Sequence, residues 1–160
     1  KRLKIKGIEN TIEACDYLKD NSKAGEKVVI IGGGLTGCEI ALDLHQKGKT
    51  PIIVEARNDL IAVRGVCLAN SSYLREFFAL NNVDVHLEAS VQEITKDGVA
   101  IKNKDGEEIF IEADTVIMSI GYNPKTIPET KRKIHLVGDC HEVGNLRTVT
   151  WRAWDVGMKI

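Results

Sequence analysis

A run of four β-branched residues ends in three consecutive glycines, and few folds accommodate such a junction. Residues 28–31 are typical of a strand that is buried on both faces. Glycines then recur as Gly32-x-Gly34-x-x-Gly37, and a helical pattern begins directly behind the turn. A helix that starts in this way presents free N–H groups and its positive dipole end to an anion. The sequence therefore predicts a strand–turn–helix unit that binds a dinucleotide pyrophosphate.

Each glycine of this fingerprint has a physical task. Gly32 permits the tight turn, Gly34 lets the backbone approach the pyrophosphate, and Gly37 lets the helix pack closely on the strand. Glu55 ends the next predicted strand, 18 residues after Gly37, where an acid accepts hydrogen bonds from ribose hydroxyls. Its charge repels a 2′-phosphate, which favours NAD(H) over NADP(H), although Arg57 close by can accommodate that phosphate. The expected cofactor-binding residues here are Gly32, Gly33, Gly34, Leu35, Thr36, Gly37, Glu55, Ala56 and Arg57.

Two other interpretations of this junction stay open. A glycine turn also occurs in α/β domains that bind no nucleotide. Methyltransferase-type cofactor sites likewise combine a glycine-rich loop with a strand-end acid. The complete order of strand, loop, helix, strand and acid favours a dinucleotide site, and the third glycine fits a methyltransferase poorly.

The remaining patterns predict an α/β fold, in which a Rossmann-like parallel sheet has helices on both faces. Helices are expected at residues 10–20, 35–47, 68–81 and 146–160. Strands are expected at residues 28–31, 51–54, 83–87, 115–120 and 134–137. Two Asp-Gly pairs, at 97–98 and 105–106, indicate hairpin turns. They predict a three-stranded antiparallel meander, inserted over residues 90–113.

Composition excludes several classes of protein. Twenty-two Lys+Arg against 23 Asp+Glu leave a formal net charge of −1, which argues against a nucleic-acid-binding or polybasic membrane-surface domain. No apolar run approaches the ~18 residues that a membrane span needs. Without a secretory signal and without a CxxC pair, a cytoplasmic protein with reduced thiols is expected. The chain does not begin with Met, so we expect it to be part of a longer protein.

Three segments in a fixed order resemble the pyridine nucleotide–disulfide oxidoreductase flavoproteins. Residues 32–41 (GGGLTGCEIA) are similar to the NAD(P)H-domain fingerprint of that family. Residues 117–124 (IMSIGYNP) resemble its second glycine motif, and residues 134–139 (IHLVGD) resemble its Gly-Asp motif. Residues 138–149, together with the short segment between Pro124 and Ile134, are similar to the C-terminal part of enoate reductases and dienoyl-CoA-reductase-like proteins of the old yellow enzyme group.

The resemblance implies three parts of the chain. A lead-in helix and linker would occupy residues 1–27, and an NAD(H)-binding domain residues 28–121. A linker and a strand–helix pair that belong to an FAD domain would follow at residues 122–160. Further cofactor contacts are implied at Gly121, at Gly138 and at Asp139, which would hold FAD. Glu39 would face the nicotinamide–flavin junction and orient the ring as the catalytic residue; a solvated acid that complements the helix dipole is the equally weighted alternative.

The resemblance also implies a function. The chain would pass hydride from NADH to FAD within a larger enzyme that reduces activated C=C bonds, with FMN and a [4Fe-4S] cluster in domains outside this chain. Its partners would be its own FAD and barrel domains, and oligomerisation stays open. Because it carries half of the FAD site, the chain alone is expected to be colourless and inactive. The NADH domain of another FAD-dependent reductase or NADH oxidase is the alternative.

Smaller groups of residues allow further interpretations. Cys38 or Cys140 would serve a redox-regulated interaction domain, the third functional hypothesis. His135, Cys140 and His141 lie near Asp139 in the sequence, but strand alternation separates His135 from the others, and no metal site is predicted.

Overall fold

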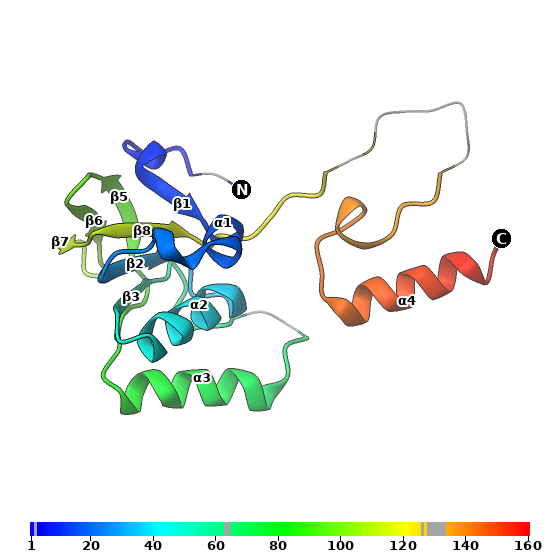
Figure 1. Cartoon of the computed structure of the whole chain (residues 1–160), viewed down its shortest axis with the longest axis horizontal. Coiled ribbons are helices and arrows are strands. Elements are labelled where there is room, and N and C mark those ends of the chain that lie inside the picture. Colours follow the sequence, from blue (N-terminus) through cyan, green and yellow to red (C-terminus); the bar gives the residue numbers. More distant parts are fainter. Residues whose placement is uncertain (2, 63–64, 126, 128–133) are drawn as a thin grey trace. The chain divides into compact units, whose positions relative to one another are not determined.

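The computed structural model describes residues 1, 3–62, 65–125, 127 and 134–160. The chain divides into two compact units (Figure 1). The first unit comprises residues 2–120, and the second unit comprises residues 121–160 together with Lys1. No helix in these described ranges is long and apolar enough to cross a bilayer.

A five-stranded parallel sheet forms the centre of the first unit. In spatial order its strands are β1 (Thr11–Glu13), β8 (Thr115–Met118), β2 (Lys27–Ile31), β3 (Thr50–Val54) and β4 (Asp84–His86). β2 pairs with β8 on one side and with β3 on the other, and residues 28–31 are buried. This central place explains the unbroken β-branched run, because such a strand has no face turned to water.

Helices cover one face of this sheet. They are α1 (Ala14–Lys19), α2 (Leu35–Gln46) and α3 (Leu68–Leu80). Their buried side chains, Tyr17, Leu44 and Phe78 among them, form one hydrophobic core with Ile30 and Ile53 of the sheet. Figure 1 shows α2 and α3 next to each other below β2 and β3.

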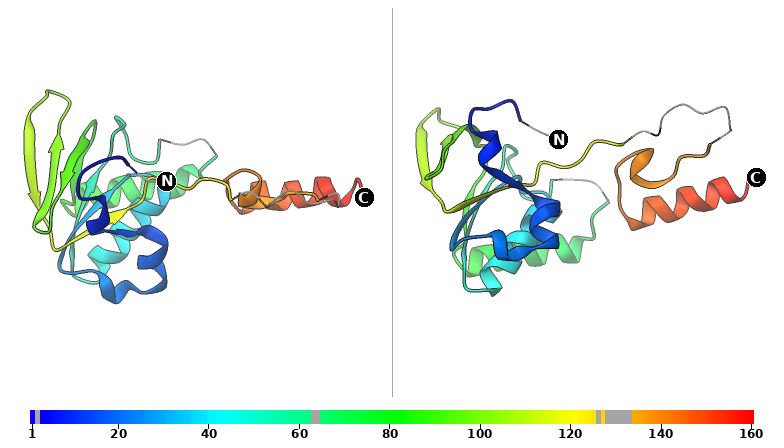
Figure 2. Two further views of the ribbon diagram at one scale, coloured as in Figure 1. Left: turned by 90° about the horizontal axis from the view of Figure 1, so that it is seen from above. Right: turned by 45° about the horizontal axis from the view of Figure 1, so that its top comes forward.

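The opposite face is covered by a second sheet, which corrects the expectation of helices on both faces. β5 (Ser90–Ile94), β6 (Gly98–Lys102) and β7 (Glu108–Glu112) form the predicted antiparallel meander. Val29 and Ile31 alternate away from the helices and share a core with Val99 and Ile101 of β6. Because the meander buries this face, no helix is needed there. The α/β class itself is confirmed, and Figure 2 shows the two sheets in further views.

The helix expected at residues 10–20 is shorter than predicted. A 3₁₀ turn, η1 (Ile8–Asn10), leads into β1, and α1 begins only at Ala14. β1 pairs in parallel with β8, with Thr11 opposite Val116. This pairing satisfies backbone groups that a helix would otherwise satisfy internally. The N-terminal segment therefore adds an edge strand to the sheet.

The second unit contains a 3₁₀ turn, η3 (Gly138–Cys140), and the helix α4 (Leu146–Gly157), which confirms the helix expected there. Asn145 and Thr148 form a capping box at the start of α4. The strand expected at residues 134–137 is absent, because a strand needs a neighbour for its N–H and C=O groups and the described part of this unit offers none. Most of the expected linker, Pro128 included, lies outside the described residues.

Candidate nucleotide-binding site

The predicted turn between β2 and α2 lies at the carboxyl edge of the parallel sheet. Gly32 has a φ of +108°, which favours glycine, and its N–H donates to the carbonyl of Val54 at 2.8 Å. A Cβ at Gly32 would lie 2.4 Å from the carbonyl oxygen of Ser119, just beyond β8. The turn is therefore packed against the ends of both neighbouring strands, and Ser119 lies in residues 117–124, the segment that resembles the second glycine motif.

The start of α2 offers unpaired donors and open space. Gly34 precedes the first helical residue, Leu35, without a side-chain cap. The N–H of Cys38 donates to the carbonyl of Gly34 at 3.0 Å, so the N–H groups of Leu35, Thr36 and Gly37 are among those that a helix start leaves unpaired. A Cβ at Gly34 would meet no atom within 4 Å. The residues present thus fit the phosphate groups of a dinucleotide.

Gly37 has the opposite environment. A Cβ there would lie 2.0 Å from the carbonyl oxygen of Gly32 and 3.4 Å from the Ile30 side chain. One turn further on, Ala41 is completely buried. Small residues at both positions let α2 approach the turn and β2 as closely as the fingerprint predicts.

Glu55 follows β3 and reaches back to the glycine turn. Its Oε2 accepts a hydrogen bond from the N–H of Gly33 at 2.6 Å, and its Oε1 accepts one from the N–H of Arg57 at 2.8 Å. Ala56 and Arg57 are exposed, and the Arg57 guanidinium donates to the carbonyl of Ala62. The structure therefore brings the predicted acid and the glycine turn together, with the carboxylate oriented by two backbone donors.

The segment behind Glu55 also contacts the glycine turn, which the sequence did not indicate. The N–H of Ile61 donates to the carbonyl of Gly33 at 2.7 Å. A Cβ at Gly33 would lie 2.5 Å from Cδ2 of Leu60, and both Leu60 and Ile61 are buried. Arg75 of α3 binds the same segment through the carboxylate of Asp59.

Cys38 lies in the middle of the fingerprint but is unsuited to redox chemistry. Its side chain is completely buried and donates to the carbonyl of Gly33 at 3.4 Å. Burial, followed by the nearby charge of Glu55, raises the pKa of the thiol to about 12. Both features oppose the hypothesis of a redox-regulated domain that uses Cys38, since a reactive cysteine needs an accessible thiolate. Cys140 is half-buried and donates to the carbonyl of Val137 at 2.9 Å.

The other predicted site residues lie apart from the turn or in the second unit. Glu39 is exposed on α2. Gly121, with a φ of +83°, and Gly138, with a φ of +67°, belong to the second unit. There Oδ1 of Asp139 accepts a hydrogen bond from the N–H of Gly144 at 3.2 Å. Within the described residues, no three His, Cys, Asp or Glu side chains gather as a metal site would require.

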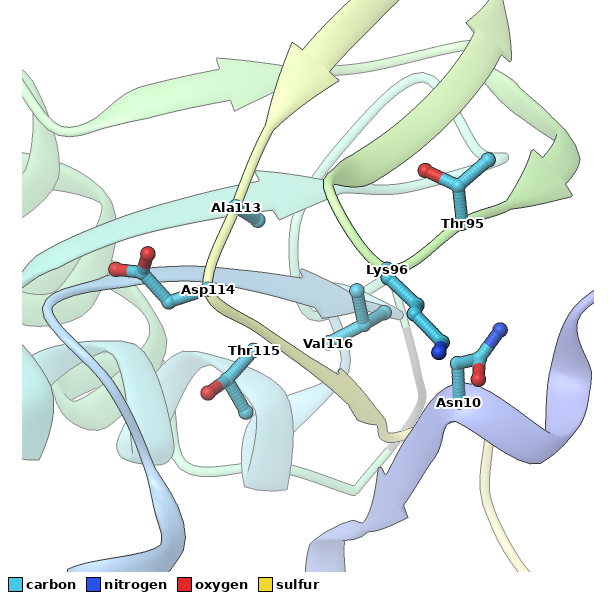
Figure 3. Close-up of a pocket in the computed structure, with 7 residues that line it drawn as sticks. All are labelled: Asn10, Thr95, Lys96, Ala113, Asp114, Thr115 and Val116. Atoms are coloured by element: carbon cyan, nitrogen blue, oxygen red, sulfur yellow. The ribbon is translucent and has the colours of Figure 1, made fainter.

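A hollow of about 210 Å³ lies at the other end of the parallel sheet (Figure 3). Its lining residues are Asn10, Thr95, Lys96, Ala113, Asp114, Thr115 and Val116. Asn10 precedes β1, and Thr115 begins β8. The hollow thus lies at the amino ends of these strands, whereas ligands of parallel α/β sheets bind outside the carboxyl ends. We do not assign the nucleotide to it.

Comparison with known proteins agrees with this geometry. Residues 1–148 match the family described as pyridine nucleotide-disulphide oxidoreductase. The chain is 38% identical to a cinnamate reductase of Clostridium sporogenes over 164 residues, which cover 99% of the chain and 24% of that protein. It is 33% identical to an NADH oxidase of Thermoanaerobacter brockii, over 98% of the chain and 26% of that protein.

The similarity extends to solved structures. All of the chain superposes on 25% of a 2-naphthoyl-CoA reductase that was solved with 2-naphthoyl-CoA, with a TM-score of 0.90 and 28% identity. A thioredoxin reductase of T. acidophilum matches 78% of the chain with a TM-score of 0.63 and 26% identity, over 42% of its own length. The chain spans about a quarter of the two curated relatives and of the naphthoyl-CoA reductase.

Proposed function

The chain belongs to the pyridine nucleotide-disulphide oxidoreductase family, and from this membership we propose that it is the NADH-binding domain of a flavin-dependent oxidoreductase. In the whole enzyme, hydride would pass from NADH to FAD. The observation that carries the proposal is the open space beside Gly34 at the start of α2, with the carboxylate of Glu55 oriented at the end of the next strand. A dinucleotide needs both features, one for its pyrophosphate and one for its ribose.

The residues of this chain would bind and orient the cofactor. When bound, the nicotinamide supplies the hydride chemistry, and the protein contributes its placement. The N–H groups of Leu35 and Thr36 would hold the pyrophosphate at the positive end of α2. The free lone pairs of Glu55 would accept hydrogen bonds from the adenosine ribose. Glu39 would orient the nicotinamide next to the flavin.

A preference for NADH over NADPH is part of the proposal. The negative charge of Glu55 would repel a 2′-phosphate. Arg57 is the residue that could offset this repulsion, but its guanidinium donates to the carbonyl of Ala62. A phosphate would have to be bound through the N–H groups that this hydrogen bond leaves free.

We further propose an activated C=C bond as the substrate of the whole enzyme. Support comes from the similarity to a cinnamate reductase and to a 2-naphthoyl-CoA reductase. The FAD site would be completed by a domain outside this chain, with Gly121, Gly138 and Asp139 as the contribution of the second unit. FMN, a [4Fe-4S] cluster and a barrel domain would also lie outside this chain.

One observation favours a second candidate. The similarity to an NADH oxidase fits an NADH domain whose flavin reduces an acceptor other than an alkene. The upstream reading frame would separate the two, since a second GxGxxG and a four-cysteine run are expected for the enoate-reductase arrangement. Consumption of NADH by the full-length protein with cinnamate under anaerobic conditions, compared with consumption under oxygen, is the enzymatic test.

Direct titration of the chain with NADH and NADPH tests the binding proposal. We expect saturable binding of NADH, with weaker binding of NADPH; no detectable binding of either nucleotide would overturn the proposal. We also expect the purified chain to be colourless and to lack reductase activity. A flavin absorbance band at near-stoichiometric occupancy would contradict the assignment of only half of an FAD site to this chain.

A further inference from the structure

The middle residue of the glycine turn, Gly33, is held from two sides. Gly33 donates its N–H to Glu55 and accepts, at its carbonyl, the N–H of Ile61 at 2.7 Å. The side chain of Leu60 packs against the same residue, since a Cβ at Gly33 would lie 2.5 Å from its Cδ2. Leu60 and Ile61 are therefore buried against Gly33, whose N–H in turn is hydrogen-bonded to the Glu55 carboxylate.

One of these two residues, Ile61, has an unfavourable backbone conformation. Ile61 has a φ of +53°, and a β-branched residue rarely adopts the left-handed region. Such a conformation persists only where the surroundings enforce it, and it occurs most often at functional sites. Ile61 has this left-handed conformation while its N–H is hydrogen-bonded to the carbonyl of Gly33. The segment is held in place by the burial of Leu60 and Ile61 in the hydrophobic core and by one further polar contact.

Arg75 supplies that contact from α3. Its Nε and Nη2 atoms donate to the two carboxylate oxygens of Asp59 at 2.9 and 2.8 Å, and Nη2 also donates to the carbonyl of Leu60. Two parallel hydrogen bonds between a planar guanidinium and a carboxylate define direction as well as distance. The guanidinium thus holds the segment at Asp59 and at Leu60, directly before Ile61.

We propose that Arg75 is a positioning residue of the nucleotide site. It acts through Asp59 and Leu60, keeps Ile61 hydrogen-bonded to Gly33, and thereby orients Glu55 for the ribose. This inference rests on the proposed function. If so, Arg75 on α3, a helix outside the fingerprint, also influences the preference for NADH over NADPH, because that preference depends on the position of the Glu55 carboxylate.

The test measures the dissociation constants of NADH and NADPH for the full chain and for Arg75→Gln. We expect the Kd for NADH to rise about tenfold, as for residues within one hydrogen-bond network, and the ratio of the NADPH Kd to the NADH Kd to fall. Arg75→Lys keeps the charge but loses the planar fork, so it should show the same fall in the ratio. In a Glu55→Gln background, Arg75→Gln should change the ratio no further.

Two more variants make the outcome decisive. Asp59→Asn removes the carboxylate with little change of shape at a largely exposed side chain, and it should act like Arg75→Gln even if the latter fails to fold. Lys6→Gln removes an exposed ion pair with Glu93 in the same unit and should leave both constants unchanged. Circular dichroism and thermal unfolding confirm that each variant is folded.

The results separate two kinds of failure. Folded Arg75 and Asp59 variants whose constants are unchanged, or which lose both nucleotides equally, would overturn the positioning role while the proposed function stands. Failure of the unchanged chain to bind either nucleotide would overturn both proposals.

Discussion

The backbone N–H of Gly33 donates to Oε2 of Glu55 over 2.6 Å, although 22 residues separate them in the sequence. The second carboxylate oxygen accepts the N–H of Arg57. Both oxygens are therefore directed by the backbone, and each keeps a lone pair for a ligand. The strand-end acid and the glycine turn are thus joined by direct hydrogen bonds.

Replacing Glu55 with Gln should reduce the preference for NADH. The amide keeps the shape but loses the charge, and its NH2 group can no longer accept one of the two backbone N–H groups, of Gly33 or of Arg57. Hydrogen bonds to the ribose therefore weaken, and the repulsion of a 2′-phosphate disappears. We expect the Kd for NADH to rise about tenfold, with little loss of NADPH affinity. Isothermal titration measures both constants. Glu108→Gln, at an exposed position of β7, is the matched control, and an unchanged NADH/NADPH ratio in Glu55→Gln would contradict the assignment.

Alanine at Gly34 and at Gly37 should separate binding from stability. The methyl group at Gly34 meets no protein atom, so the free energy of unfolding should change by less than about 1 kcal/mol. It would occupy the space assigned to the pyrophosphate, and NADH affinity should fall about tenfold or more. The methyl group at Gly37 would collide with the carbonyl of Gly32 and should destabilise the fold by about 1–3 kcal/mol. Normal NADH binding by Gly34→Ala would argue against the site.

Cys38 should resist thiol reagents in the folded chain. Its thiol is completely buried, with its pKa raised to about 12, whereas Cys67 is exposed. A colorimetric thiol assay at pH 8 should modify Cys67 first and Cys38 only after denaturation. Peptide mapping identifies the labelled residue. Rapid labelling of Cys38 in the native chain would show that the helix start opens readily.

The raised pKa of Cys38 also predicts that the stability of the fold declines at alkaline pH. Because the folded pKa lies above the ordinary value of 9.0, the unfolded chain loses this proton first. The contribution of Cys38 to stability is therefore complete below about pH 9 and is lost as the pH rises toward 12. Denaturant unfolding at several pH values measures the effect. Cys38→Ala should show a weaker alkaline decline than the unchanged chain.

Tyr17→Phe should destabilise the first unit. The buried Tyr17 hydroxyl donates to Oδ2 of Asp43 at 2.7 Å and links α1 to α2. The partner carboxylate is partly exposed and also binds Lys47, so we expect a loss of about 1 kcal/mol. Urea unfolding measures it. Tyr73→Phe, at an exposed ring, should change the free energy of unfolding by no more than about 0.5 kcal/mol. Equal effects of both substitutions would show that the Tyr17–Asp43 hydrogen bond does not stabilise the fold.

The local elements of the fold could be predicted from the sequence. The nucleotide fingerprint, for example, consists of a β-branched run before Gly32, a helix that starts after Gly34 and an acid at Glu55. All three lie within about 30 residues, so their pattern can be read from the sequence alone. Asp-Gly turns likewise indicated the meander. β1 could not be found in this way, because three residues of a strand carry no clear periodicity and Thr11 finds its partner only at Val116. The strand expected at residues 134–137 has no partner among the described residues.

The sequence by itself determined the chemistry of the proposed nucleotide site: glycines where a side chain would collide or would block a ligand, and an acid at the following strand end. The tertiary structure alone decided which face the meander covers, that Arg75 reaches Asp59, and that Ile61 donates to Gly33. The physical reason is the range of the interactions. Turn and helix preferences depend on adjacent residues, whereas packing and hydrogen bonds between distant segments depend on which apolar faces and polar groups the folded chain brings together.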